Sequence, residues 1–246
     1  MRSSHGAAVA QQSEGRNPPS APALKGSRTQ AEANRQYFRE AYRTGEHGWE
    51  QSEASPHVLR LLRRVHEAVP GERLLDLGCG EGRHCLIAAR LGFETVGVDY
   101  EPLAVERARR LASSAGQGEI AFCVGDALSL PFAVASFDVV VDYGCLHHQR
   151  KADWPTYKAN LLRVLRPRGF YVLSVFSPRF RLFRGSSRRW HLAHGAYRRC
   201  FTREEMVRLW ESDFSFLDLV EERGKDRGMW HALLQRRALA TKDEKP

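Results

Sequence analysis

The sequence lacks long hydrophobic runs. Across its 246 residues, no apolar stretch approaches the roughly 18 residues that a membrane-spanning helix requires. Residues 1–30 also lack the continuous apolar segment of a secretory signal. We therefore expect a soluble, cytoplasmic protein with no membrane partner.

Cysteine is scarce and scattered. The five cysteines include no C-x-x-C pair, and most of them fall inside apolar patterns. Disulfide frameworks and cysteine-based zinc motifs are thereby disfavoured, and we expect buried thiols and no metal site. A reactive or arsenic-binding set of thiols is the alternative.

The charge is unbalanced, with a formal net charge of +9 carried by far more arginine than lysine. This charge permits nucleic-acid binding without implying it. A hydrophobic content of 42% suits one α/β domain with appendages. Residues 1–28 have almost no large apolar side chains, which predicts a disordered tail.

The central motif is the segment 74–82, Leu-Leu-Asp-Leu-Gly-Cys-Gly-Glu-Gly. It predicts a buried parallel strand, a tight glycine turn and a helix that begins near Gly82. Glycine lets a ligand approach the backbone, and the amides at the helix start can bind it. The G-x-G-x-G spacing, with Asp76 two residues before Gly78, differs from the G-x-G-x-x-G of nicotinamide dehydrogenases. A plain glycine turn of another α/β protein is the other interpretation.

This motif resembles the nucleotide-binding loop of class I S-adenosylmethionine-dependent methyltransferases. The resemblance implies that S-adenosylmethionine is the cofactor and that the motif binds it. The residues concerned are Asp76, Gly78, Cys79, Gly80 and Gly82.

The next predicted strand, 95–100, ends in an acid. Asp99 lies 21 positions after Gly78, the distance at which an α/β nucleotide site places a carboxylate for both ribose hydroxyls. Tyr100 is then placed to pack on the adenine. An aspartate that only caps the following helix, 102–114, is the alternative.

A third strand, 120–124, runs into Gly125-Asp126-Ala127. This loop resembles the adenine-recognition loop of the same methyltransferases. The resemblance implies that Asp126 accepts a hydrogen bond from the adenine amino group and that the Ala127 amide supports the ring. Asp126 is otherwise a simple turn former.

The fourth strand and its loop cover 136–148. An apolar run marks a central strand whose carboxyl end opens on the crevice of the glycine loop, which places Asp142 and Tyr143 near the reacting methyl group. The sequence Cys-Leu-His-His at 145–148 matches the family pattern. We predict His147 as the base or acceptor contact, with Asp142 beside it, and His148 as a helix-start, packing or substrate residue.

Residues 29–68 predict a helical lid: one helix over 29–44 and a second after Ser55-Pro56. The aromatic pattern loosely resembles methyltransferases of the thiopurine and tellurite type. Tyr42 or Trp49 would then close over the cofactor and exclude water. The alternative is that these aromatic residues pack a helix onto the sheet edge.

The last part of the chain predicts a helix over 154–165, a strand over 170–176, a helix over 202–209 with a capping box, and strands over 214–220 and 229–236. Between them, a basic insertion at about 178–203 carries eight arginines. It is predicted either as a cap that holds an anionic substrate, for example through Arg184 and Arg188, or as a solvated loop.

Together these motifs predict an α/β methyltransferase domain over 69–240. Its Rossmann-like sheet would have seven mostly parallel strands, helices on both faces, and an antiparallel last strand. The favoured function is methyl transfer to O, N or S of a small molecule, because no Asn-Pro-Pro-Tyr sequence follows the fourth strand. An anionic acceptor is the finer expectation. Alternatives are an RNA or protein methyltransferase that uses the arginine-rich segment, a non-catalytic S-adenosylmethionine-binding module, and a nicotinamide dehydrogenase.

Overall fold

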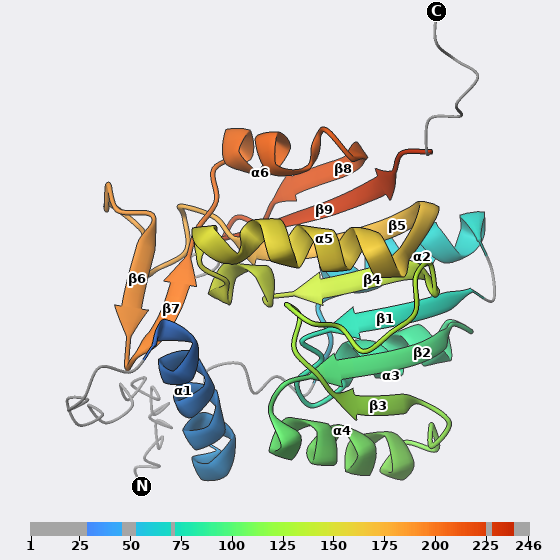
Figure 1. The fold of residues 1–246 in the computed structure, drawn as a ribbon. Helices are drawn as coiled ribbons and strands as arrows, with labels where there is room; N and C mark the ends of the chain where they lie inside the picture. Colours follow the sequence, from blue (N-terminus) through green and yellow to red (C-terminus); the bar gives the residue numbers. More distant parts are fainter. Residues whose placement is uncertain (1–28, 46–52, 70–71, 225–227, 239–246) are drawn as a thin grey trace, which may run out of the picture.

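The computed structural model describes residues 29–45, 53–69, 72–224 and 228–238 (Figure 1). The predicted disordered tail, 1–28, and the predicted lid residue Trp49 lie outside the described residues.

A seven-stranded sheet forms the centre of the fold (Figure 1). Its strands are β1 (Arg73–Leu77), β2 (Glu94–Asp99), β3 (Ala121–Val124), β4 (Phe137–Tyr143), β5 (Leu165–Phe176), β8 (Phe214–Glu221) and β9 (Met229–Arg236). They lie in the order β3-β2-β1-β4-β5-β9-β8. Strands β1 to β5 are parallel, whereas β9 is antiparallel to both β5 and β8. The predicted sheet, with its reversed last strand, is confirmed.

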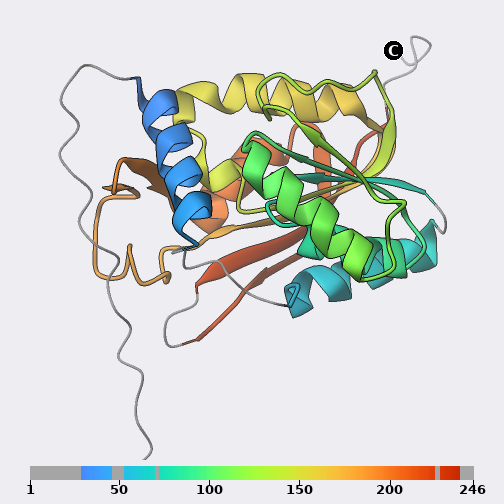
Figure 2. The same ribbon diagram turned by 90° about the horizontal axis from the view of Figure 1, so that it is seen from below.

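Helices cover both faces of the sheet, as the alternation of buried side chains requires. The described helices are α1 (Gln30–Thr44), which lies apart from these faces, and α2 (Pro56–Ala68), α3 (Arg83–Arg90), α4 (Pro102–Ser114), α5 (Trp154–Val164) and α6 (Arg203–Trp210). Along β4, Val139 and Val141 pack with α2, while Val140 packs with α5 and α6. Figure 2 shows α5 along one side of the sheet and α2 along the other.

The two helices of the predicted lid differ in position. Helix α2 buries Val58, Leu61, Leu62 and Val65 against the sheet, so it belongs to the core. Helix α1 instead contacts α4 and the strand β7 (Ala196–Arg199), beside the carboxyl ends of the parallel strands (Figure 1). Only α1 is therefore placed to act as a lid.

The basic insertion contains a β-hairpin that the sequence analysis missed. Strands β6 (Trp190–Ala193) and β7 pair in antiparallel register, joined by His194 and Gly195. Both joining residues have positive φ, 51° and 83°, as a two-residue type I′ turn requires. The signal available in the sequence was the pair His194-Gly195, with a short segment of alternating apolar and polar residues on each side.

Two local features go beyond the predicted elements. Strand β5 begins at Leu165, so residues 166–169, between the predicted helix and the predicted strand, form a bulge within β5, where the pairing with β4 shifts. On α4, the buried face consists mainly of alanines, whereas Leu111 is exposed. A side chain larger than alanine would not fit at position 108, because α4 packs closely on the glycine loop. A Cβ added to Gly82 would lie only 3.1 Å from the Cβ of Ala108.

Candidate active site

The glycine loop joins β1 to α3 through three residues with positive φ. Gly78, Gly80 and Gly82 have φ values of 74°, 55° and 82°, a region that other residues rarely adopt. A Cβ on Gly78 would lie 2.9 Å from the Cβ of Cys145, and one on Gly80 would lie 3.0 Å from the Tyr42 hydroxyl. The loop therefore needs glycine for its conformation and for the close approach of its neighbours.

Asp99 ends β2 and holds this loop. Its carboxylate accepts the N–H groups of Gly80 and Glu101, each at 2.9 Å. Burial raises the pKa of Asp99 to about 6, against the lowering effect of these hydrogen bonds. Each carboxylate oxygen has a second lone pair, so Asp99 can still accept hydroxyl groups from a ligand.

A cavity opens where the carboxyl ends of β1, β2 and β3 meet. Its lining includes five of the residues predicted to bind the cofactor: Gly78, Asp99, Tyr100, Asp126 and Ala127. The rest of the lining is formed by Leu77, Gly125 and Cys145, which belong to the predicted motifs, and by Val98 and Gln149, which were not predicted as site residues. The predicted motifs, spread over fifty residues of sequence, therefore converge on one site.

Tyr100 lines this cavity. Its hydroxyl is buried and has no hydrogen-bond partner among the described residues. The ring meets Phe38 of α1 edge to face at 5.9 Å, and the guanidinium of Arg35 lies 5.8 Å from its centre. A buried, unpartnered hydroxyl is costly, so a ligand that bonded it would be favoured.

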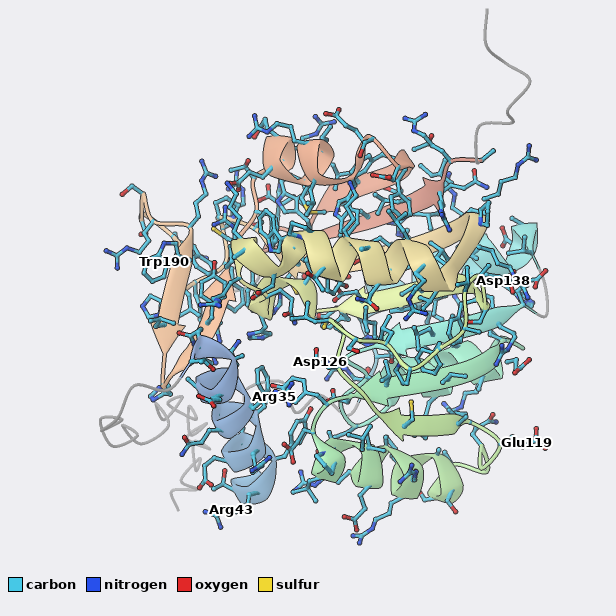
Figure 3. The ribbon with its side chains drawn as sticks, in the orientation of Figure 1. Arg35, Arg43, Glu119, Asp126, Asp138 and Trp190 are labelled. Atoms are coloured by element: carbon cyan, nitrogen blue, oxygen red, sulfur yellow. The ribbon has the colours of Figure 1, made fainter. Side chains whose placement is uncertain are left out.

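Arg35 reaches from α1 to the predicted adenine loop (Figure 3). It donates to Asp126 at 2.5 Å, and the other Asp126 oxygen accepts the N–H of Leu128 at 2.9 Å. The contact ties the lid helix to the loop. The sequence offered no signal for this pairing, because Arg35 lies on the polar side of its helix and 91 residues from Asp126.

Tyr42 also lies over the glycine loop. Its side chain is buried, and its backbone carbonyl accepts a hydrogen bond from Arg107 of α4 at 2.6 Å. Arg107 in turn pairs with Glu81 of the loop at 2.9 Å. These contacts hold the end of α1 against the loop in the position expected of a lid.

Asp76 and Tyr143 lie on neighbouring strands at the same edge. Asp76 is buried, accepts the thiol of Cys85 at 3.3 Å, and has a pKa that burial raises to about 7. The Tyr143 ring lies between His84, at 4.7 Å, and the guanidinium of Arg83, at 5.4 Å. Neither residue lines the cavity described above. Cys79, which was also predicted to bind the cofactor, does not line it either and is buried within the loop.

Asp142 is engaged entirely by the protein. Its carboxylate accepts the N–H groups of Cys145 and Leu146 at 2.6 and 3.0 Å, and the hydroxyls of Tyr157 and Tyr171 at 2.5 and 3.3 Å. Burial raises its pKa to about 6. Because the side chain is fully buried, these contacts favour a positioning role for the loop after β4 over the predicted contact with the methyl group.

His147 and His148 point into different surroundings. His147 is stacked on Phe176 with centres 3.7 Å apart, and its Nδ1 accepts the Phe176 N–H at 3.3 Å. Its remaining ring nitrogen, Nε2, therefore carries the proton in the neutral ring, and burial lowers the pKa of His147 well below its usual value. His148 bonds the Tyr197 carbonyl through Nδ1 at 2.8 Å, as its predicted packing role requires.

The arginines of the basic insertion differ in their contacts and exposure. Arg198 donates to the Tyr37 hydroxyl at 2.6 Å, and Arg199 donates to Glu205 at 2.7 Å. Arg184 and Arg188 are exposed, and the Arg188 guanidinium lies 5.0 Å from the centre of the Trp190 ring.

No helix among the described residues combines the length and apolar character needed to cross a membrane.

Comparison with known proteins matches this site to a family. A protein-family model described as a methyltransferase domain covers residues 74–169, which hold the glycine loop, Asp99, Asp126 and His147. Residues 74–169 therefore form a methyltransferase domain.

Two curated relatives match this methyltransferase domain over part of their length. Norajmaline N-methyltransferase of Rauvolfia serpentina is 32% identical over 110 residues, 44% of this chain and 37% of the relative. The 24-methylenesterol C-methyltransferase 2 of Oryza sativa subsp. japonica is 38% identical over 144 residues, 52% of this chain and 39% of the relative. The chain thus spans well under half the length of either protein.

A solved structure extends the similarity to most of the fold. The 1,6-didemethyltoxoflavin-N1-methyltransferase of Burkholderia thailandensis, with bound 1,6-didemethyltoxoflavin and S-adenosylhomocysteine, superposes with a TM-score of 0.69. It covers 88% of this chain and 94% of its own, at 24% identity. The common fold includes elements outside the methyltransferase domain match.

The residues of this methyltransferase domain fit S-adenosylmethionine. The glycine cradle leaves no room for a Cβ at Gly78, the Asp99 carboxylate lines the cavity, and the buried Tyr100 hydroxyl lacks a partner among the described residues. The buried Asp76 and Asp142 and the partly buried Asp99 place three carboxyl groups near the same edge, which suits a cationic cofactor.

Proposed function

We propose that the chain transfers a methyl group from S-adenosylmethionine to an oxygen, nitrogen or sulfur atom of a small molecule. The observation that carries the proposal is the convergence of Gly78, Asp99 and Asp126 on one cavity within a methyltransferase domain. When bound, the cofactor supplies an activated sulfonium methyl group. The protein then has to align the acceptor and exclude water.

The residues divide this work by position. Asp99 accepts the ribose hydroxyls, Asp126 accepts the adenine amino group, and the glycine loop lets the cofactor approach the backbone. Tyr42 and Arg35 hold α1 over the cavity and keep water out. This assignment follows from the hydrogen-bonding capacity that each group retains beside the cavity.

His147 was predicted as the base, and its contacts support a narrower role. With Nδ1 occupied by the Phe176 N–H, the neutral ring presents an N–H at Nε2 to any acceptor. We propose that His147 orients an acceptor by donating this hydrogen bond. The acceptor then arrives deprotonated or loses its proton to another group.

We propose that the methyl acceptor is a small molecule and that it carries a negative charge. A groove of about 450 Å³ lies between α1, the segment before α5 and the β6–β7 hairpin. Its lining combines apolar and cationic side chains: Gln30, Arg150, Lys151, Trp190, Leu192, Tyr197 and Arg199. This mixture suits an aromatic or amphipathic anion. A cytoplasmic location remains a prediction from the sequence.

An RNA or protein acceptor is the second candidate, favoured by the exposed Arg184, Arg188 and Trp190 on one segment. Neutralising several phosphates would make binding strongly salt-dependent. A methyl-transfer assay with labelled S-adenosylmethionine, run on RNA and on small-molecule extracts at two salt concentrations, separates the candidates. Label recovered only in RNA or protein would overturn the small-molecule proposal.

The first experiment tests the cofactor site. We expect S-adenosylmethionine and S-adenosylhomocysteine to bind by calorimetry and NAD not to bind. Asp99→Asn should weaken both adenosyl ligands by about 1–3 kcal/mol, roughly 5- to 150-fold in Kd, because a ribose hydroxyl loses its acceptor. Glu94→Gln, on the exposed opposite end of β2, is the matched control.

Two results would count against the proposal. Failure of both adenosyl ligands to bind the folded protein would remove the cofactor assignment. Tight binding without methyl transfer to any acceptor class would instead favour the non-catalytic module, in which the site is retained for binding alone.

A further inference from the structure

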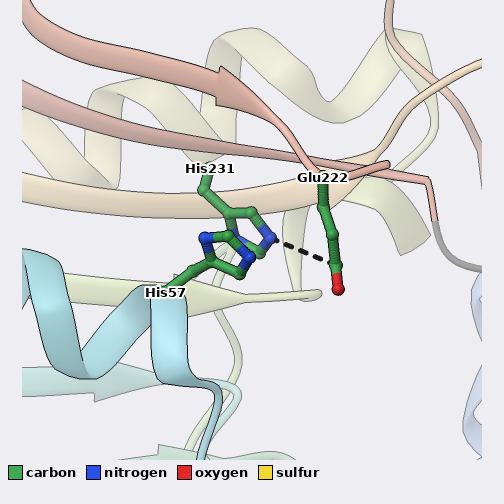
Figure 4. Close-up of side chains that lie close together, drawn as sticks. All are labelled: His57, Glu222 and His231. Atoms are coloured by element: carbon green, nitrogen blue, oxygen red, sulfur yellow. Dashed lines mark hydrogen bonds and ion pairs between the residues drawn. The ribbon is translucent and has the colours of Figure 1, made fainter. Parts of the chain in front are cut away.

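Three metal-ligating side chains meet outside the cavity of the methyltransferase site (Figure 4). His57 belongs to the first turn of α2, Glu222 follows β8, and His231 lies on β9. One potential ligand atom from each residue lies within 4.8 Å of the other two. Elements far apart in the sequence therefore bring two imidazoles and a carboxylate together.

His231 is held in an orientation suited to a metal ligand. Its side chain is fully buried, and Nδ1 lies 2.9 Å from the Ser174 hydroxyl oxygen. Without a metal, Nε2–H donates to the Glu222 carboxylate at 3.4 Å. With a metal in place of that proton, Nδ1–H donates to Ser174 and Nε2 offers its lone pair to the ion. Such a second hydrogen bond is how proteins fix the ring and tautomer of a metal-binding histidine.

His57 lies directly against His231. The two rings are stacked with centres 4.1 Å apart and planes 8° from parallel. Ligand atoms on a tetrahedral zinc ion are about 3.3 Å apart, given bonds of about 2.0–2.1 Å. The ligand atoms of the trio, which lie within 4.8 Å of one another, therefore have to approach by up to about 1.5 Å. His57 and Glu222 are only partly buried, so their side chains can supply this movement.

The surrounding charges permit a cation. Arg60, one turn along α2 from His57, is the nearest guanidinium on that helix, and it donates to Asp218 at 2.8 Å. The carboxylate of Glu222 supplies the negative charge within the trio. The two nitrogen ligands favour zinc-like ions over magnesium or calcium, which prefer oxygen.

We propose that His57, Glu222 and His231 bind a divalent transition-metal ion of the zinc type, with a fourth position left for water or another ligand. Two histidines and a glutamate are a known zinc donor set, and an open fourth position is typical of sites with a function beyond structure. The site lies at the carboxyl edge of the sheet, because Tyr143, Ser174 and His231 are paired across β4, β5 and β9. The proposal does not depend on methyl transfer.

The test uses the untagged full-length chain, stripped with a chelator and titrated with Co²⁺ and then Zn²⁺. We expect one Co²⁺ per chain with visible bands of low-symmetry, four-coordinate geometry, displaced by Zn²⁺ and not by Mg²⁺. Glu222→Gln and His57→Ala should each weaken the metal at least tenfold, since each removes a ligand. His191→Ala, on the exposed hairpin, is the matched control.

Circular dichroism and binding of S-adenosylhomocysteine report whether each variant is folded. Absence of the Co²⁺ bands in the folded wild-type protein would overturn the site. Equal metal affinity in wild type, Glu222→Gln and His57→Ala would do the same, because the metal would then be held by surface histidines elsewhere.

Discussion

Asp76 and Asp142 are buried acids and Asp99 is a partly buried one, all three at the carboxyl ends of neighbouring strands. Burial raises their pKa values to about 7, 6 and 6, and Asp76 also experiences the charges of the other two. The charges of Asp99 and Asp142 therefore raise the cost of ionising Asp76. A cationic ligand at this edge would relieve that cost, which would favour a sulfonium cofactor there.

Asp76 makes stability depend on pH in a defined direction. Its folded pKa of about 7 exceeds the unfolded value of about 3.9, so the folded state holds a proton that the unfolded state releases between these values. The free energy of unfolding therefore falls as pH rises from about 4 to 7, by at most about 1.4 kcal/mol per pH unit. Asp76→Asn removes this titration.

We expect Asp76→Asn to unfold at a higher temperature than wild type at about pH 8, and to differ little from it at about pH 4.5. Thermal unfolding of the ligand-free proteins at both pH values measures the effect. An equal difference at the two pH values would show that Asp76 does not titrate in this range. The same variant should bind S-adenosylmethionine more weakly at pH 8, because a negative charge is lost beside a cation.

At the scale of elements, α1 is attached to the rest of the fold by polar contacts around Asn34. The Asn34 side chain donates to the His148 carbonyl at 3.1 Å and accepts the Tyr197 N–H at 2.7 Å. Gln30 adds a bond to the Gly195 carbonyl at 2.7 Å. One side chain therefore joins the lid helix, the loop after β4 and the β6–β7 hairpin.

Asn34→Ala should release α1 while leaving the sheet folded. The lost bonds leave the Tyr197 N–H without its acceptor, at a cost of about 1–3 kcal/mol. We expect faster amide hydrogen exchange in α1 and the hairpin, together with weaker cofactor binding. Arg43→Ala, whose salt bridge stays within the exposed end of α1, is the control. Unchanged exchange in α1 would mean that its packing, not Asn34, holds the lid.

At the scale of the whole molecule, the cofactor cavity joins elements from much of the chain. Its lining comes from β1, β2 and the loops after β3 and β4, and α1 covers it. A ligand bound there should stabilise the folded state as a unit. At one hundred times its Kd, the gain is about 2.7 kcal/mol.

We therefore expect S-adenosylhomocysteine at that concentration to raise the unfolding temperature by roughly 5–10 °C, since 1 kcal/mol shifts a domain of this size by about 2–4 °C. Differential scanning fluorimetry measures the shift, and Asp99→Asn at the same ligand concentration should show a smaller one. An equal shift in both proteins would place the ligand away from Asp99.

Local patterns in the sequence determined the elements and their order. Apolar strands followed by glycine or aspartate located β1, β2 and β3, and helix caps such as Thr202 located α6, because these signals depend on neighbouring residues. The rule that carboxyl ends of parallel strands share an edge then predicted that Gly78, Asp99 and Asp126 would meet, and they line one cavity.

The tertiary structure decided which side chains are free to act. Asp142 is occupied by four donors, His147 has its Nδ1 bonded, and Arg35 pairs with Asp126 from 91 residues away. The trio of His57, Glu222 and His231 likewise joins α2 to the distant edge of the sheet. No local pattern encodes such contacts, since hydrogen-bond partners and burial depend on how separate elements pack against one another.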